Sequence, residues 1–444
     1  MAKKKETLTP EERLQAALVP ESEQPYPVPE NWCWTYLTKG AAECLDSFRK
    51  PINASERANR AGDIPYYGAT GQVGWIDDFL TNEQLVLVGE DGAPFLDLIK
   101  DKAYIIEGKA WVNNHAHILR SRFGTVGNLF LMHYLNVFNY NDFVNGTTRL
   151  KLTQGSMDTM PVPIPPLTEQ QRIVNRIESL FAKLDEAKQK AQDALDSFET
   201  RKAAILHKAF TGELTAQWRK EHGVGMESWD NTTLSKIVIG FKYGTSEKSD
   251  YSYKGMPVFR IPNITDDGLS FEDLKFLSHK DISDENQIHE NDILIVRSNG
   301  SRELVGKSVL VPQLDREYAY ASFLIRIQPL ESVVPNYLVM YLNSTDARMQ
   351  MFKKAKSSAG INNINSKELG AILINLPSFS EQAEIVRILD NLLAKEQLAK
   401  EAAEGVLEQI DLIKKAILAR AFRGELGTND PGEESAVELL KQVL

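Results

Sequence analysis

One stretch of the chain nearly matches a phosphate-binding loop. Residues 300–308 read GSRELVGKS, but five residues separate the two glycines where the glycine-rich loop of nucleotide-binding proteins has four. That loop also needs a helix directly after its lysine, and here a strand-like SVLVP run follows. We therefore interpret the segment as a surface loop, either a plain hairpin or one that offers basic and amide side chains to DNA: Arg297, Asn299, Arg302 and Lys307.

A second stretch has the residue types of a metal-dependent nuclease. Glu107 and Lys109 follow Asp91 and Asp97, and two carboxylates with a lysine could hold Mg²⁺ and polarise water. A Glu-x-Lys triplet is common where 25% of residues are charged. A surface strand carrying Lys109, itself a candidate DNA contact, is the preferred interpretation, and a nuclease centre is the alternative.

Histidines and asparagines gather in the string NNHAH at residues 113–117. His115 and His117 could ligate a metal, but no third or fourth ligand is evident, so structural hydrogen bonding is favoured. Asn113 and Asn114 are candidate adenine readers, because an amide can pair with an adenine edge through two hydrogen bonds. Two further loops, at 146–149 and 360–363, precede equivalent prolines and supply more candidate DNA contacts: Thr147, Thr148, Arg149, Asn362 and Asn363.

No catalytic signature stands out. The chain lacks an N/D-P-P-Y/F motif and a glycine-rich cofactor turn after a strand, and no serine–histidine–aspartate set can be argued. We predict a protein with no catalytic residue, no metal site and no cofactor of its own.

An internal repeat organises the chain. Residues 167–214 and 379–426 align without a gap, and 20 of the 48 aligned positions are identical. The preceding strings VPIPPLTEQ and INLPSFSEQ match, with Pro165 equivalent to Pro377, and Trp32 in ENWCWTYL is equivalent to Trp229 in ESWDNTTL. Each repeat therefore consists of a globular block, a proline hinge and a long segment that ends in GEL.

The repeated segments have the pattern of long helices. Apolar residues recur in steps of four and three, the period of a coiled coil, which predicts two helices at 169–209 and 381–421 packed antiparallel. Thr168 and Ser380 are the expected N-caps, Gly212 and Gly424 the expected ends, and Glu396 interrupts the second seam. The seam and partner-docking candidates are Ile173, Ile177, Leu180, Leu184, Ile385, Leu389, Leu392, Val406 and Ile410.

The blocks predict mixed α/β domains. Strand-like runs (LVLVG, AYII, HAHILR, PVFRIPNI, DILIVRSNG, SVLVP) alternate with turns, and 129–138 and 335–342 are helical in pattern. We expect two globular domains joined by two long antiparallel helices with an internal pseudo-twofold repeat. The predicted boundaries are 1–29 (helix and proline-rich linker), 30–166, 167–215 (helix), 216–226 (linker), 227–378, 379–426 (helix) and 427–444 (tail with a short helix).

Length and composition limit the number of domains and the classes of protein to which the chain can belong. A length of 444 residues fits two to three domains, and 42% hydrophobic residues exclude a mostly disordered chain. A net charge of −10 disfavours a uniformly basic nucleic-acid binder but not a local basic surface. Two cysteines, no apolar run long enough for a membrane span and no signal-peptide pattern lead us to expect a cytoplasmic protein.

This layout resembles the specificity subunit of type I restriction–modification systems. Two variable blocks, each followed by P-x-EQ and a helix closing in AF-x-GEL, carry the resemblance, as do IPYYGATGQVGWIDDF, VLVGEDGAPF, VNNHAH, VNGTTRLKLT and SSAGINNINSKELGAILINLP. It covers residues 32 to 426; the N-terminal helix and Glu396 depart from the pattern.

The resemblance implies a non-catalytic subunit that reads a split, asymmetric site on double-stranded DNA through two target-recognition domains. It also implies paired helices that dock two adenine methyltransferase subunits, with motor-nuclease subunits completing the complex, and S-adenosylmethionine, ATP and Mg on those partners. Two alternatives stay open: the recognition subunit of a related methyltransferase–nuclease that cuts beside its site, and a coiled-coil protein-interaction adaptor.

Overall fold

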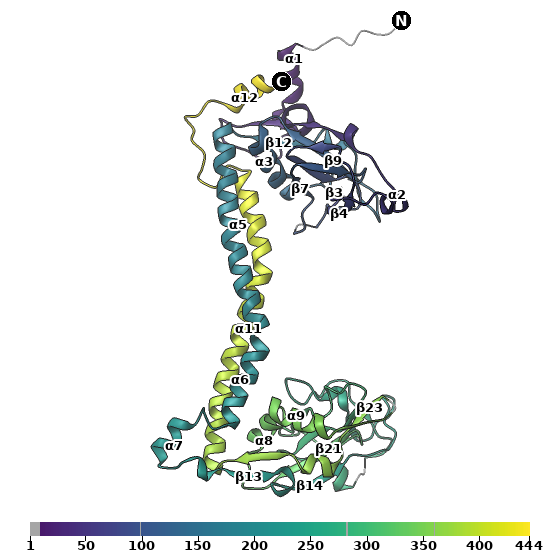
Figure 1. Cartoon of the computed structure of the whole chain (residues 1–444), viewed down its shortest axis with the longest axis vertical. Helices are drawn as coiled ribbons and strands as arrows, with labels where there is room; N and C mark the ends of the chain where they lie inside the picture. Colours follow the sequence, from purple (N-terminus) through teal and green to yellow (C-terminus); the bar gives the residue numbers. More distant parts are fainter. Residues whose placement is uncertain (1–8, 98, 281–282, 359) are drawn as a thin grey trace. The chain divides into compact units, whose positions relative to one another are not determined.

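The structure, a computed structural model, describes residues 9–97, 99–280, 283–358 and 360–444. The chain divides into two compact units (Figure 1). Unit 1 consists of residues 1–192 and 404–444, and unit 2 of residues 193–403, so the division runs through the long helices. None of the described helices is both long and apolar enough to cross a membrane.

Unit 1 is built on two four-stranded sheets, with strand orders β2-β9-β6-β7 and β4-β3-β8-β5. Helix α3 (Gly124–Val137) packs against β6, β7 and β9, and its buried aromatic residues join the main core. The strands are β1 (Cys33–Tyr36), β2 (Ala42–Cys44), β3 (Ile64–Gly68), β4 (Gly71–Ile76), β5 (Thr81–Asn82), β6 (Leu85–Gly89), β7 (Ala103–Ile106), β8 (Lys109–Val112), β9 (Ala116–Ser121), β10 (Val144–Asn145), β11 (Lys151–Leu152) and β12 (Pro161–Ile164). Short helices α2 (Ala54–Ala58) and α4 (Gln154–Met157) complete the block.

Unit 2 has a four-stranded sheet of order β14-β21-β17-β19 and two three-stranded sheets, β16-β15-β20 and β18-β23-β22. Its strands are β13 (Asp230–Thr233), β14 (Val238–Tyr243), β15 (Pro257–Phe259), β16 (Lys275–Phe276), β17 (Ile293–Val296), β18 (Ser298–Asn299), β19 (Ser308–Leu310), β20 (Ala319–Tyr320), β21 (Leu324–Pro329), β22 (Lys356–Ser358), β23 (Ile361–Asn363) and β24 (Leu373–Leu376). The helices of the block are α8 (Pro335–Leu342), α9 (Thr345–Lys354) and α10 (Ser366–Gly370). The predicted mixed α/β blocks are confirmed.

The same two-stranded clasp closes both blocks. In unit 1, β1 pairs antiparallel with β12, and in unit 2, β13 pairs antiparallel with β24. The first strand of each pair follows the repeated tryptophan, Trp32 or Trp229, and the second precedes the long helix. Each block therefore begins and ends at one place, where the helix starts.

Within unit 1, the first long helix and the end of the second run antiparallel. Helix α5 (Leu167–Asp196) lies beside residues 404–421 of α11 (Phe379–Ala421), as Figure 1 shows. Lys414 pairs with Asp185 at 2.6 Å, while Asp411, earlier in α11, lies 3.8 Å from Lys188, later in α5. The residue numbers run in opposite senses, so the predicted antiparallel packing is confirmed for this segment.

Within unit 2, α6 (Phe198–Phe210) and residues 379–403 of α11 also run antiparallel. The ammonium of Lys400 lies 5.1 Å from the ring centroid of Phe198, and Arg201 pairs with Glu396 at 2.8 Å. The glutamate that interrupts the predicted seam is thus matched by a basic residue on the opposing helix.

The first long helix is not continuous, contrary to prediction. It divides at Ser197, whose hydroxyl donates to the carbonyls of Asp193 (2.9 Å) and Ala194 (3.1 Å). A serine hydroxyl bonded back to the preceding turn competes with the helical hydrogen bonds and bends the helix.

Burial differs among the residues of the predicted seam. Ile173, Ile177, Ile385, Leu389 and Ile410 are buried, whereas Leu180, Leu184 and Leu392 are half-buried.

The assignment of Val406 to the seam is wrong, because its side chain is 41% exposed. After Ala403, the side of α11 that faces the other helix consists instead of Leu407, Ile410 and Lys414. The ammonium of Lys414 lies over the ring of Phe181. The aliphatic stem of Lys414 thus contributes to the inward face, while the neighbouring Ile413 is 42% exposed.

The expected N-caps are also wrong. The helices begin at Leu167 and Phe379, before Thr168 and Ser380. The hydroxyl of Ser378 accepts from the Glu381 amide at 3.4 Å, while Thr168 donates to Glu433 in the tail.

The predicted helix ends are confirmed. Gly212 and Gly424 have φ of +83° and +74°, which favours glycine.

The two terminal helices are as predicted and meet each other. Helix α1 (Pro10–Ala17) has the capping box of Thr9 and Glu12, and α12 (Ala436–Val443) is capped by Ser435. The guanidinium of Arg13 donates to the carbonyl of Leu444 at 2.6 Å. Linker helix α7 (Ala216–His222) follows α6 in unit 2.

Candidate nucleic-acid interface

Four loops of unit 1 meet at one end of its sheets. The Asn113 amide donates to the carbonyl of Tyr67 (3.1 Å), which places the 113–115 turn beside the end of β3. The Glu90 amide donates to the carbonyl of His115 (2.8 Å), and the Leu152 amide donates to the carbonyl of Glu90 (2.7 Å). The loops at 68–71, 89–92, 113–115 and 145–151 therefore form one surface, called here the unit 1 loop cluster.

Most unit 1 candidates lie exposed on this cluster. Asn114, Thr147, Thr148 and Arg149 are exposed, and the Arg149 guanidinium pairs with Asp91 at 2.8 Å. Asn113 differs: it is buried, and its Oδ1 accepts from the His115 amide at 2.8 Å. It shapes the turn instead of facing outward.

A network of charges supports the loop cluster from beneath. Arg49 pairs with Asp46 at 2.8 Å and also with Glu90, and Lys151 lies 2.9 Å from Glu90. Burial alone would raise the pKa of the Asp46 carboxyl, but hydrogen bonds from His117 and the Ile118 amide, with the charge of Arg49, lower it. Burial would also raise the pKa of the Glu90 carboxyl, but hydrogen bonds from Arg49 and Lys151 lower it. Both carboxylates are held ionised.

One group in this network has metal-ligand chemistry. Asp46, Glu90 and His117 place ligand atoms within 4.8 Å of one another. However, Arg49 contacts both carboxylates, and His117 already faces Asp46 (2.6 Å) and the carbonyl of Leu152 (2.8 Å) through its two ring nitrogens. A divalent cation would meet the guanidinium charge, so the arrangement is an ion-pair network, and the structural interpretation of the histidines fits it.

The nuclease alternative is not supported by the geometry. Lys109 begins β8, at the opposite end of that strand from Asn113, with its ammonium 4.9 Å from the Phe79 ring centroid. Glu107 accepts from Gln84 at 3.0 Å, while Asp91 pairs with His115 and Arg149. Lys109 lies outside the loop cluster, and these carboxylates have separate partners.

In unit 2, the asparagine candidates meet in one small sheet. β18 pairs with β23, aligning Ser298 with Asn363 and Asn299 with Asn362. The Asn362 amide donates to the carbonyl of Gly300 (3.0 Å), and Asn299 Oδ1 accepts from the Ser301 amide (2.7 Å). These side chains hold the loop after β18 against β23.

The three basic candidates of unit 2 lie in different places. Arg297 adjoins the asparagine sheet, with its guanidinium carbon 4.5 Å from the ring centroid of Tyr243. Arg302 lies against α9, donating to the carbonyl of Phe352 at 2.8 Å.

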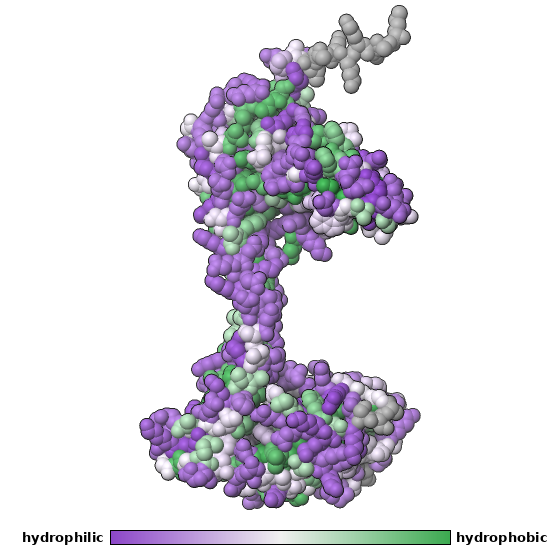
Figure 2. Space-filling model, in the orientation of Figure 1, coloured by the Kyte–Doolittle hydropathy of each residue, from purple (hydrophilic) through white to green (hydrophobic). Residues whose placement is uncertain are grey.

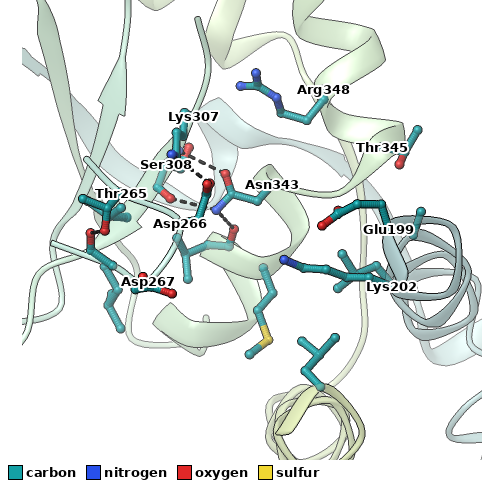
Figure 3. Close-up of a pocket in the computed structure, with 18 of the residues that line it drawn as sticks. Glu199, Lys202, Thr265, Asp266, Asp267, Lys307, Ser308, Asn343, Thr345 and Arg348 are labelled. Carbon is teal, nitrogen blue, oxygen red and sulfur yellow. Dashed lines mark hydrogen bonds and ion pairs between the residues drawn. The ribbon is translucent and has the colours of Figure 1, made fainter. Parts of the chain in front are cut away.

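Lys307 faces a pocket of about 570 Å³ between α6, α8, α9 and the 265–268 loop (Figure 3). Its ammonium pairs with Asp266 at 2.8 Å, and strand β19 follows directly. The segment therefore lacks the helix that a phosphate-binding loop requires. Glu199, Lys202 and Arg348 also line this pocket, so its charge is mixed.

Sequence reasoning missed the supports of the unit 1 cluster. Sequence patterns do not indicate Arg49, Asp46 or Glu90 as site residues, and they indicate Asp91 only as a possible metal ligand. Apart from the pair of Arg49 with Asp46, the contacts named here join residues 24 to 71 positions apart, and no local spacing indicates such contacts.

Comparison with known proteins identifies the family. The type I restriction modification DNA specificity domain matches residues 43–195 and 226–408, more than half of the chain. The protein belongs to the family of type I restriction–modification specificity subunits.

The EcoKI specificity subunit of Escherichia coli K12 is 28% identical over 331 residues, covering 71% of this chain and 70% of that protein. A putative specificity subunit of Haemophilus influenzae is 36% identical over 141 residues, which is 32% of this chain and 35% of its own length. The crystal structure of the HsdS subunit from Thermoanaerobacter tengcongensis superposes with a TM-score of 0.63 at 19% identity, covering 91% of this chain and all of that one. The predicted fold class is thereby confirmed.

Proposed function

We propose that this chain reads a bipartite, asymmetric site on double-stranded DNA, one half-site per globular block, without catalysing a reaction itself. In this proposal it brings adenine methyltransferase and motor-nuclease subunits to that site, in the cytoplasm where the DNA lies.

The duplicated architecture carries the proposal. Each block is closed by the same clasp and followed by a repeated helix, yet the loop residues differ: threonines and Arg149 in the 145–151 hairpin of unit 1, asparagines in the β22–β23 hairpin of unit 2. A shared frame with different loops suits two readers of different sequences.

The outer face of α11 is a candidate surface for the partner subunits. In unit 1 it exposes Val406 (41%), Leu412 (58%) and Ile413 (42%). The face of the paired helices that Figure 2 shows is mainly hydrophilic. Apolar residues exposed on a helix suit docking against a partner helix.

Methylation mapping tests the reading function. DNA from cells that carry this chain and its methyltransferase partner is expected to show one bipartite adenine-methylated motif. Replacing residues 30–160 by the matching block of a relative is expected to alter one half of that motif. If both halves changed together, the blocks would not read independently.

Co-purification tests the docking face. The variant Leu412→Asp/Ile413→Asp is expected to lose the methyltransferase subunit while unit 1 melts normally. Ile239→Asp, at a site 66% exposed on β14 of unit 2, is the matched control and should keep the partner. Retention of the partner by the α11 variant would exclude this face.

A further inference from the structure

The hairpin that carries Arg149 is fixed to the body of unit 1. β10 and β11 pair through Val144–Leu152 and Asn145–Lys151, and the Gly92 amide donates to the carbonyl of Leu150 at 3.2 Å. The tip turns at Gly146, whose φ of +110° favours glycine. The 149 position therefore has a defined backbone location above the 89–92 loop.

The Arg149 guanidinium is oriented by what lies beneath it. Nη2 donates to Oδ1 of Asp91, and the same oxygen is 2.7 Å from Nδ1 of His115. A methyl group built on Gly92 would lie 3.3 Å from Nε and 3.5 Å from Nη2 of Arg149. The Nε–Nη2 edge thus faces the protein, which leaves Nη1 and the second hydrogen of Nη2 directed away from Asp91.

Charge is layered in this part of the cluster, with cations outside and carboxylates inside. The side chains of Arg149 and Lys151 are 62% and 50% exposed, while those of their partners Asp91 and Glu90 are 21% and 14% exposed. The acids restrain the cations without forming the outer surface. An anionic partner approaching the hairpin therefore meets guanidinium and ammonium groups first.

We infer that Arg149, oriented by Asp91, reads a guanine in the half-site bound by unit 1. A guanidinium with two parallel N–H groups facing outward matches O6 and N7 of guanine in the major groove. Asp91 and His115 are positioning residues that hold the fork in place. The inference rests on the proposed function and assigns one residue and one base within it.

The equivalent hairpin of unit 2 has a different composition. Its β23 strand carries Asn362 and Asn363, with no arginine between positions 355 and 370. A hairpin that specifies sequence is expected to differ between two domains that read different half-sites, so this divergence is consistent with the role assigned to Arg149.

The first test is methylation mapping of Arg149→Ala with the partner subunits present. One G·C position in the unit 1 half-site is expected to become degenerate, while the unit 2 half-site stays unchanged. Arg120→Ala is the matched control, because the Arg120 side chain is 41% exposed and pairs with Glu83 at 2.8 Å, but lies on β9. A strict parental motif in the Arg149→Ala variant would overturn the inference and leave the two-domain reading function intact.

The second test uses binding and does not depend on methylation. Each guanine of the unit 1 half-site is replaced in turn by 7-deazaguanine, which lacks the N7 acceptor. For the wild-type complex, one replacement is expected to weaken binding about 2- to 12-fold, because the N7 bond, about half of an arginine–guanine contact worth about 1–3 kcal/mol, is lost while O6 still accepts. The Arg149→Ala complex should be insensitive to that replacement. Equal sensitivity of both complexes would refute the assignment.

The variant Asp91→Ala tests whether Asp91 orients the Arg149 guanidinium, separately from the contact of Arg149 with the guanine. It retains the arginine but frees its guanidinium and removes a negative charge, so non-specific DNA binding should hold or strengthen while discrimination at the guanine falls. A variant that kept full discrimination would show that Asp91 does not orient Arg149. Failure of the wild-type complex to methylate any bipartite motif would instead contradict the proposed function itself.

Discussion

Substituting Glu381 is expected to destabilise unit 2 severely, because this carboxylate is fully buried at the start of α11. It accepts from the hydroxyl of Thr215 (2.6 Å), the guanidinium of Arg219 (2.6 Å) and the indole of Trp229 (3.0 Å). Arg219 is itself 7% exposed. The four residues link α11, the turn after α6, α7 and the start of β13.

The magnitude follows from what remains after the change. Glu381→Met leaves a buried guanidinium without its counter-charge, which costs about 3–5 kcal/mol. Glu381→Met/Arg219→Met removes both charges, so it should be more stable than the single variant despite carrying one more substitution. For a unit of this size, about 2–4 °C per kcal/mol predicts a loss of roughly 6–20 °C in the melting temperature of unit 2 for the single variant.

Calorimetry on the full chain, with hydrogen exchange to assign the transition to unit 2, measures these effects. Glu384→Met is the control: this residue lies one turn further along α11 and pairs with Arg387 near the surface, where a pair contributes about 0–1 kcal/mol. A loss below about 1 kcal/mol for Glu381→Met, or additive losses in the double variant, would refute the reasoning.

His133, Gly424 and the helix length give three further predictions. Burial lowers the pKa of His133 to about 4, so the folded state binds fewer protons than the unfolded state between about pH 6.5 and 4. The free energy of unfolding therefore falls by up to about 3 kcal/mol as the pH drops through that window. The variant His133→Leu should reduce this loss in acid unfolding curves, and an unchanged dependence on pH would contradict the prediction. Gly424→Ala should lower the melting temperature of unit 1, because the added methyl would lie 2.4 Å from Cγ of Pro29 at a φ of +74°, whereas unchanged melting would show that this turn relaxes freely. Four-residue insertions after both Ser197 and Ala399 would each add about 6 Å of helix. Because a base pair advances about 3.4 Å, the spacer of the methylated motif should lengthen by one or two base pairs. An active mutant with the parental spacer would show that the helices do not determine the spacer length.

The repeat made the architecture predictable. Trp32 and Trp229 recur at an offset of 197, the hinge prolines and the paired EQ strings recur at an offset of 212, and the structure shows that they mark the clasps and the helix starts. Such features are local in sequence, so they stay recognisable although the blocks between them have diverged in length and sequence.

The helix seam and the candidate interface were harder to predict from the sequence, for physical reasons. Lys414 carries an apolar stem and a charged end, and the ring of Phe181 opposite it explains why a lysine lies on the inner face. Asn113 and Lys109 are polar residues whose exposure depends on neighbouring loops. The pairing of Arg49 with Glu90 and of Arg149 with Asp91 joins segments 41 and 58 positions apart, which no periodic pattern encodes.

The division of unit 1 between the two ends of the chain has a consequence for its biosynthesis. Its main core includes Leu418, Phe422 and Leu440 together with Phe130, whose ring lies 5.0 Å from that of Phe422. Unit 2, by contrast, consists only of residues 193–403. On a ribosome that releases the chain from its N-terminus, unit 2 can therefore fold before unit 1 is complete. A chain that stopped short of residue 418 would hold a finished unit 2 and an unfinished unit 1, so the core of unit 1 is completed only when its C-terminal segment has been made.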